Sequence, residues 1–154
     1  MENYSVKLSW ERGEDDFLDK KYHRAHTWSF DGGATVAASS SPNVLPPPMS
    51  DPTGVDPEEA FVAAIASCHM LWFLAIAAKH RWIVDSYEDQ PVGTMDKNDQ
   101  GKTAVAVVTL RPKVVFVGEH QPTEYEVETL HHEAHGLCFI ANSVKSEIRI
   151  EPRG

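Results

Sequence analysis

The sequence predicts a single α+β domain, residues 1–154, in which antiparallel strands surround a long buried helix. Apolar and polar residues alternate in several short segments, and this period of two is typical of half-buried strands. The run 60–78 carries no formal charge, which indicates a central helix. Strands come in groups before, between and after two helical segments. This order favours antiparallel hairpins over a regular alternation of strand and helix.

The N-terminal part is expected to contain three strands. Residues 4–10 alternate in character, and a second alternation covers residues 22–30. The turn sequence Asp31-Gly32-Gly33 then precedes a third short strand at 34–38. Arg24 falls on the aromatic face of the second strand, which we expect to point inward.

A stiff loop and the long helix are expected to follow. Residues 39–56 contain five of the ten prolines, so this segment forms neither a regular helix nor a central strand. Asp56 is the expected N-cap and Pro57 the first helical residue, with the helix running to about Lys79 or His80. Apolar residues surround most of its axis, so we expect it to lie in the protein interior. The polar residues at its middle argue against a membrane span.

The C-terminal part is expected to contain further strands and a second helix. Segments 82–88 and 103–117 have strand character, and Pro112 marks a bulge or an edge in the second of them. Thr123 and Glu126 form a capping-box pattern at the start of the helix. The helix is expected to end at Asn142, before a last strand at 144–150.

Charge and cysteine content restrict the possible partners and location. The chain has 14 Lys and Arg against 23 Asp and Glu, a formal charge of −9, which repels phosphate backbones and anionic lipid. We therefore expect neither nucleic acid nor a membrane as a partner. Two cysteines are too few for a secreted disulfide framework, and the first residues form no apolar signal segment. A cytoplasmic location is the expectation.

The two cysteines are the first candidates for chemistry. Cys68 lies within the uncharged run, and Cys138 closes the histidine-rich stretch HHEAHGLC. If the two predicted helices cross, these thiols can form a redox pair. A thiol buried among apolar residues stays protonated unless a cation approaches it. Arg24 is the best candidate for that cation, although an edge-strand arginine that reaches solvent fits the same pattern.

Glu58 is the candidate carboxylate partner for such an arginine. It precedes Cys68 by ten residues, which is about 15 Å along a straight helix at ~1.5 Å per residue. The two side chains therefore cannot meet directly. Glu58 would act through Arg24 or at the site of another subunit, or else it only complements the helix dipole.

A metal site is an alternative for the second helix. His131, His135 and Cys138 share one helix face, and imidazole with thiolate is a good zinc ligand set. The stretch lacks the His-Glu-x-x-His spacing of zinc peptidases, however, and no second ligand pair stands at short spacing elsewhere. We expect no metal and no cofactor. A third possibility is that both cysteines are merely packed in the core of a dimer.

Two segments resemble the OsmC/Ohr family of thiol-dependent peroxidases. They are DPEEAFVAAIASC, which ends at Cys68, and AHGLCFIANSVKSEI, which contains Cys138. The resemblance implies an intertwined homodimer with two active sites at its interface. It further implies that Cys68 is the peroxidatic thiolate and that Cys138 resolves its sulfenic acid as a disulfide, which a dithiol or a protein thiol then reduces. Glu58 matches the family glutamate that pairs with the active-site arginine.

The chain departs from the family pattern in two places. Proline commonly follows the second cysteine in the family, and here Phe139 follows it. One branch keeps its arginine in the proline-rich loop, which contains none in this chain. Arg24 therefore remains the candidate activating residue, with Arg12 as a substitute.

Apolar residues near the two cysteines predict the substrate class. Phe61, Ile65, Trp72 and Phe139 are expected to form a pocket for an alkyl or aryl tail, which favours organic hydroperoxides over hydrogen peroxide. Detoxification in an oxidative stress response would be the role. The alternative is a non-catalytic OsmC-like protein that binds a metal through His131, His135 and Cys138, or a small apolar ligand.

Overall fold

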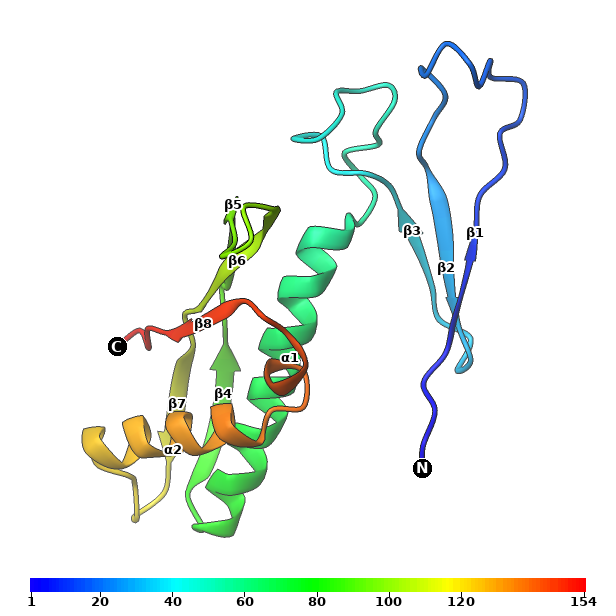
Figure 1. Cartoon of the computed structure of the whole chain (residues 1–154). Helices are drawn as coiled ribbons and strands as arrows, with labels where there is room; N and C mark the ends of the chain where they lie inside the picture. Colours follow the sequence, from blue (N-terminus) through cyan, green and yellow to red (C-terminus); the bar gives the residue numbers. More distant parts are fainter. The chain divides into compact units, whose positions relative to one another are not determined.

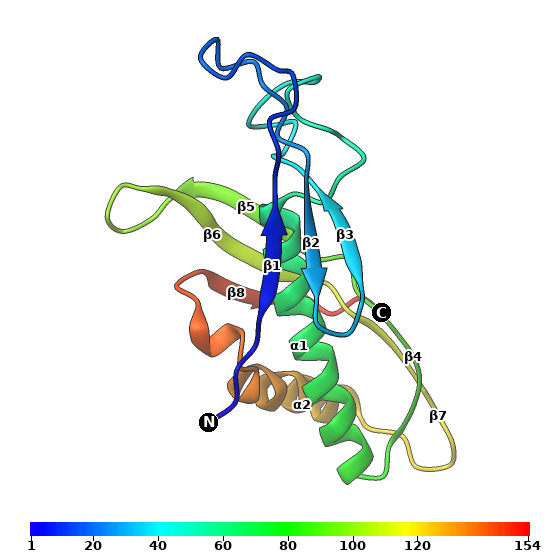
Figure 2. The ribbon, with the colours of Figure 1, turned by 90° about the vertical axis from the view of Figure 1, so that its right-hand side faces the viewer.

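The computed structural model describes all 154 residues, which divide into two compact units, Met1–Ala60 and Phe61–Gly154. The first unit contains a three-stranded antiparallel sheet with the order β1-β2-β3, drawn as three blue arrows in Figure 2. The strands are β1 (Val6–Ser9), β2 (His26–Phe30) and β3 (Thr35–Ala38). The three predicted strands are thus confirmed. The second is shorter than expected, because residues 22–25 are loop.

Buried serines hold the proline-rich loop in place. Ser39, Ser41 and Ser50 are all buried. The Ser39 hydroxyl accepts a hydrogen bond from the backbone N–H of Asp51 at 2.9 Å, and the Ser50 hydroxyl donates to the carbonyl of Leu45 at 2.6 Å. These side chains satisfy backbone groups of the loop in addition to its backbone hydrogen bonds, such as the one from the Val55 N–H to the carbonyl of Ala37 at 2.9 Å.

The long helix α1 (Pro57–Lys79) begins and ends where the sequence predicts. Asp56 caps it reciprocally with Glu59: the Asp56 carboxylate accepts from the Glu59 N–H at 2.8 Å, and the Glu59 carboxylate accepts from the Asp56 N–H at 2.9 Å. In length and composition α1 would suffice to cross a membrane, but the core helices of soluble proteins share that property.

The second unit contains two small sheets, whose strands are labelled in Figure 1. One pairs β4 (Ile83–Glu88) with β7 (Lys113–Val117) in antiparallel fashion. The other has β6 (Thr103–Leu110) between antiparallel β5 (Val92–Lys97) and parallel β8 (Glu147–Ile150). A single strand over 103–117 was therefore a wrong prediction. Pro112 has no N–H to donate, and the chain passes from one sheet to the other at this point.

The second helix, α2 (Glu124–Leu137), begins with the predicted capping box of Thr123 and Glu126. It ends before the expected Asn142, because Cys138 already has extended backbone angles. The Asn142 side chain nevertheless caps the helix from outside by donating to the carbonyl of Gly136 at 3.1 Å. A short 3₁₀ turn, η1 (Ala141–Ser143), leads on to β8.

Helix α1 contributes to two separate apolar clusters, and α2 crosses it at the second one (Figure 1). The cluster at its N-terminal half contains buried residues from α1 and β6: Val62, Ile65, Ala66, Val108 and Leu110. The cluster at its C-terminal half contains buried residues from α1 and α2: Phe73, Ile76, Ala77, Leu130 and Ala134. The opposite face of α1 is uncovered, and its Leu71 is 60% exposed.

Candidate active site

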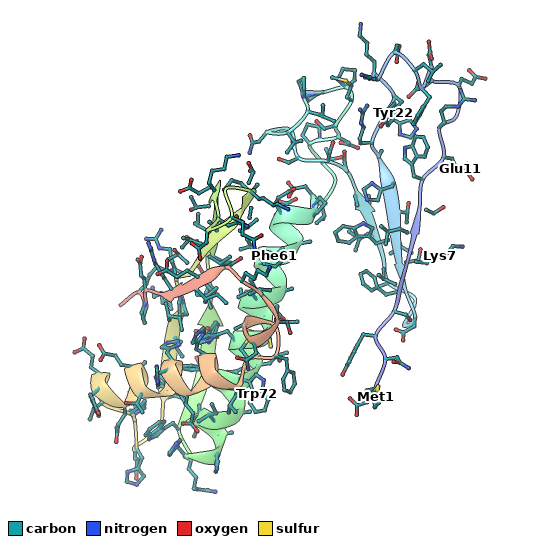
Figure 3. The ribbon with its side chains drawn as sticks, viewed as in Figure 1. Met1, Lys7, Glu11, Tyr22, Phe61 and Trp72 are labelled. Carbon is teal, nitrogen blue, oxygen red and sulfur yellow. The ribbon has the colours of Figure 1, made fainter.

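Cys68 lies on α1 between the two apolar clusters and is half-buried. It lines an open, largely apolar pocket of about 290 Å³ together with Leu71, Trp72, Ala75 and Phe139. The Trp72 and Phe139 rings meet edge to face, with centroids 5.4 Å apart and planes at 86°. Figure 3 labels Trp72 on the part of α1 that α2 crosses. The pocket thus joins a thiol to a surface suited to an apolar ligand.

Cys138 is fully buried at the C-terminal end of α2. Burial raises the pKa of its thiol to about 11, and a hydrogen bond and charge interaction with Cys68 act in the same direction. The backbone N–H of Ala141 donates to its sulfur at 3.4 Å and opposes that shift. The fold therefore places the two cysteine side chains close together as free thiols.

The pocket agrees in part with the set of residues expected from sequence. Trp72 and Phe139 line it, whereas Phe61 and Ile65 pack in the cluster at the N-terminal half of α1. Sequence reasoning did not name Leu71 and Ala75 for the pocket. Helical spacing could have found them, because they follow Cys68 by three and seven residues and so share its face.

Arg24 is held by its own loop in this structure. Its guanidinium donates to the carbonyls of Lys20, at 3.2 Å, and of Tyr22, and it stacks over the Tyr22 ring at 3.6 Å. The substitute candidate Arg12 donates to the carbonyl of Asp15 at 2.6 Å. Neither arginine forms an ion pair. Arg24 is therefore bound by local contacts that it would have to exchange before it served a thiolate.

Glu58 lies in the first turn of α1, and one of its carboxylate oxygens is buried without a hydrogen-bond partner. A carboxylate oxygen removed from water in this way is unfavourable unless a donor or a cation reaches it. Arg24 belongs to the same compact unit, yet no ion pair joins the two side chains. Glu58 is thus a carboxylate with one buried oxygen that has neither a hydrogen bond nor an ion pair in this structure.

The histidines of α2 do not assemble with Cys138 as ligands. His131 is buried and shares a 3.0 Å hydrogen bond with His69 of α1, from its Nδ1 to the Nε2 of His69. His135 has a buried Nδ1 without a partner. No three His, Cys, Asp or Glu side chains have positions that would hold a metal ion. Burial lowers the pKa of both His69 and His131 to about 4, so both rings are neutral at pH 7.

A family model described as OsmC-like protein matches residues 50–153, about two thirds of the chain. The chain belongs to the OsmC-like family. No curated protein sequence matches it.

The fold of this OsmC-like chain recurs in solved structures. It is 53% identical to an OsmC-like protein of unknown function from Vibrio cholerae, with a TM-score of 0.97 over 99% of this chain and 100% of that one. It is also similar in fold to the organic hydroperoxide resistance protein OhrB of Bacillus subtilis, with 18% identity, a TM-score of 0.68 and 98% of each chain covered. An organic hydroperoxide resistance protein OsmC from Legionella pneumophila gives 14% identity and a TM-score of 0.67 over 99% and 96% of the two chains.

Proposed function

We propose that this OsmC-like protein is a thiol-dependent peroxidase that reduces organic hydroperoxides in the cytoplasm. The observation that carries the proposal is the pair of free thiols: Cys68 opens into an apolar pocket, and buried Cys138 interacts with it. Membership in the family, and two fold relatives whose names refer to organic hydroperoxide resistance, support the same reading.

The proposed reaction begins at Cys68. Its thiolate attacks the distal oxygen of the hydroperoxide, the O–O bond breaks, and the alkoxide leaves as an alcohol after taking up a proton. Cys68 is then a sulfenic acid, oxidised by two electrons. The Cys138 sulfur attacks the sulfenic sulfur, and the hydroxyl leaves as water with the proton of the Cys138 thiol. A dithiol or a protein thiol supplies two electrons and two protons to reduce the disulfide.

The depth of Cys138 supports different roles for the two thiols. Cys138 is fully buried and its thiol pKa is raised to about 11, so it is protonated at pH 7 and inaccessible to a bulky peroxide. Cys68 lines the pocket that a substrate enters. We therefore assign peroxide attack to Cys68 and resolution to Cys138.

The pocket favours an alkyl or aryl hydroperoxide over hydrogen peroxide. Its walls are the side chains of Leu71, Trp72, Ala75 and Phe139, and they offer few hydrogen-bonding groups. A tail buried there gains about 25 cal/mol per Å² of apolar surface removed from water, and hydrogen peroxide has no such surface. Phe139→Ala should slow turnover of cumene hydroperoxide and leave turnover of hydrogen peroxide nearly unchanged.

The proposed assembly is a homodimer with Arg24 and Glu58 as supporting residues. Apolar side chains such as Leu71 and Met95 are exposed, and the buried Glu58 oxygen lacks a partner. A second copy of the chain would cover the exposed apolar side chains and supply a cation to the Glu58 carboxylate. Arg24 would then stabilise the Cys68 thiolate while Glu58 holds its guanidinium. Light scattering during size exclusion should give twice the 17.1 kDa of one chain. A monomer at all concentrations would contradict this assembly.

Intact mass tests the reaction itself. One equivalent of cumene hydroperoxide should lower the mass of the reduced protein by about two daltons, the two hydrogens lost when a disulfide forms. Cys68→Ser and Cys138→Ser should each abolish that loss, and Cys138→Ser should instead leave a sulfenic acid that dimedone traps. An unchanged mass, with both thiols still free, would refute the peroxidase. It would favour a non-catalytic protein that binds a small apolar ligand in the same pocket.

A further inference from the structure

A pair of histidines is buried where α1 and α2 cross. His69 is 1% and His131 3% exposed. The Nε2 of His69 and the Nδ1 of His131 are 3.0 Å apart, and the two ring planes differ by only 7°. The ring centroids are 5.3 Å apart, so the rings lie end to end and the hydrogen bond runs along both. The ring of Phe73 packs against His131 with centroids 4.4 Å apart.

This pair is the only hydrogen bond between the two helices. The buried apolar side chains that the two helices contribute to the crossing form one cluster of Phe73, Ile76, Ala77, Leu130 and Ala134. Apolar contacts are nondirectional, so they stabilise the crossing without fixing one register strongly. A hydrogen bond between two buried polar groups depends on their distance and direction, and in coiled coils a single buried polar residue can fix the helix register. The His69–His131 bond therefore adds geometric definition to this crossing.

The pair is not optimal for stability alone. His69 Nδ1 and His131 Nε2 are both buried without partners. In either neutral arrangement one of these nitrogens carries a hydrogen that has no acceptor. An unmade hydrogen bond of a buried group is unfavourable, and two apolar side chains of similar volume would avoid it. The presence of this pair beside a reactive thiol thus calls for a functional explanation.

The position of the histidine pair relative to the two cysteines supplies a functional explanation. His69 is the residue after Cys68 on α1, and Cys138 follows His131 by seven residues and stands directly after Leu137, the last residue of α2. The register between the two helices at the histidine pair therefore sets the separation of the two sulfur atoms. We propose that the His69–His131 hydrogen bond is a clamp that positions Cys138 against Cys68. The two histidines are positioning residues, and the proposal rests on the proposed disulfide chemistry.

A thiol exchange equilibrium measures this positioning without any peroxide. In a buffer of oxidised and reduced glutathione, the two protein thiols and one oxidised glutathione give the Cys68–Cys138 disulfide and two reduced glutathiones. The equilibrium constant reports the effective concentration of one sulfur at the other. His131→Asn keeps an amide group near the position of Nδ1, whereas His131→Gln carries it farther out, to the position of Nε2. We expect His131→Gln to lower the constant about tenfold, and His131→Asn to stay within about threefold of the wild type.

His132→Leu is the matched control, because His132 lies on the exposed side of the same helix. It should leave the equilibrium constant unchanged. The double variant His69→Gln/His131→Asn should keep the constant close to the wild-type value, because the two amides can hydrogen-bond across the crossing. The thermal stability of each variant is measured as well. If the histidine pair had a purely structural role, the substitutions would change the thermal stability but not the thiol exchange constant.

The outcomes separate the clamp from the peroxidase. Equal constants for His131→Asn and His131→Gln, or a wild type that forms no Cys68–Cys138 disulfide in glutathione, would overturn the clamp. A wild type that forms the disulfide in glutathione but does not react with cumene hydroperoxide would refute the peroxidase and leave the clamp standing. A constant about tenfold below the wild type for His131→Gln, with His131→Asn close to the wild type, supports the clamp whichever way the peroxide assay turns out.

Discussion

The buried histidine pair makes folding stability depend on pH in a calculable way. In the unfolded chain a histidine binds its proton with a pKa near 6.5, whereas His69 and His131 in the folded protein have pKa values of about 4. Between those values the unfolded chain holds more protons, so stability falls as pH falls. The stabilisation is fully present above about pH 7 and is lost progressively down to about pH 4.

The size of the effect follows from the two shifts. Lowering the pH from 7 to 5 costs about 2 kcal/mol per histidine, or about 4 kcal/mol for the pair. With a urea dependence of about 2 kcal/mol per M, the midpoint of unfolding should fall by about 2 M urea. Unfolding is followed by tryptophan fluorescence at one fixed protein concentration, because subunit association would otherwise alter the midpoint.

The double variant His69→Gln/His131→Asn isolates the pair from all other titrating groups. It keeps His135 and every carboxylate, but its amides do not titrate. Its urea midpoint should therefore vary with pH much less than that of the wild type. If the two midpoints change in parallel between pH 7 and 5, the histidines are not held neutral by burial, and the reasoning is wrong.

Four further substitutions have expected effects on the urea-derived free energy of unfolding. Phe73→Ala should cost about 3–5 kcal/mol, because the ring is fully buried at the helix crossing; a loss below about 1 kcal/mol would contradict that packing. Thr123→Ala removes the capping box of α2 and should cost about 1 kcal/mol, and an unchanged midpoint would argue against the cap. Gly93→Ala would place a Cβ 2.5 Å from a methyl of Val62 and should cost about 1–3 kcal/mol. Gly136→Ala is its control: this helical glycine has open space, so the change should stabilise by about 0.5–1 kcal/mol.

Local chemistry made much of the fold predictable. The cap at Asp56 and the box at Thr123 and Glu126 depend on residues a few positions apart, and both helices begin where those residues stand. The strand β5 has no comparable local signal. Its residues are all exposed, and it exists because it pairs with β6, which is a tertiary condition.

The sequence was enough to predict several residues of the candidate site, but not which residues they contact. Helical periodicity placed Cys68 and Cys138 on apolar faces, and the structure brings their side chains together. The same periodicity placed His131 beside Cys138 and suggested metal ligation. In fact His131 bonds to His69, and only the crossing of two helices distant in sequence could reveal that partner. The pairing of Arg24 with Glu58 stays a prediction, because it depends on a second chain.

The attachment of α1 to two separate clusters has a consequence for local unfolding. Amide hydrogens in the middle of this helix can exchange with solvent only when packing fails on both sides of them, so they should be among the slowest in the chain. Cys68 lies in that middle section, although its sulfur faces the open pocket. If Cys68 is the proposed nucleophile, a rigid backbone holds it in one orientation through the reaction cycle, and the side chains around the pocket supply the flexibility needed to admit and release substrates.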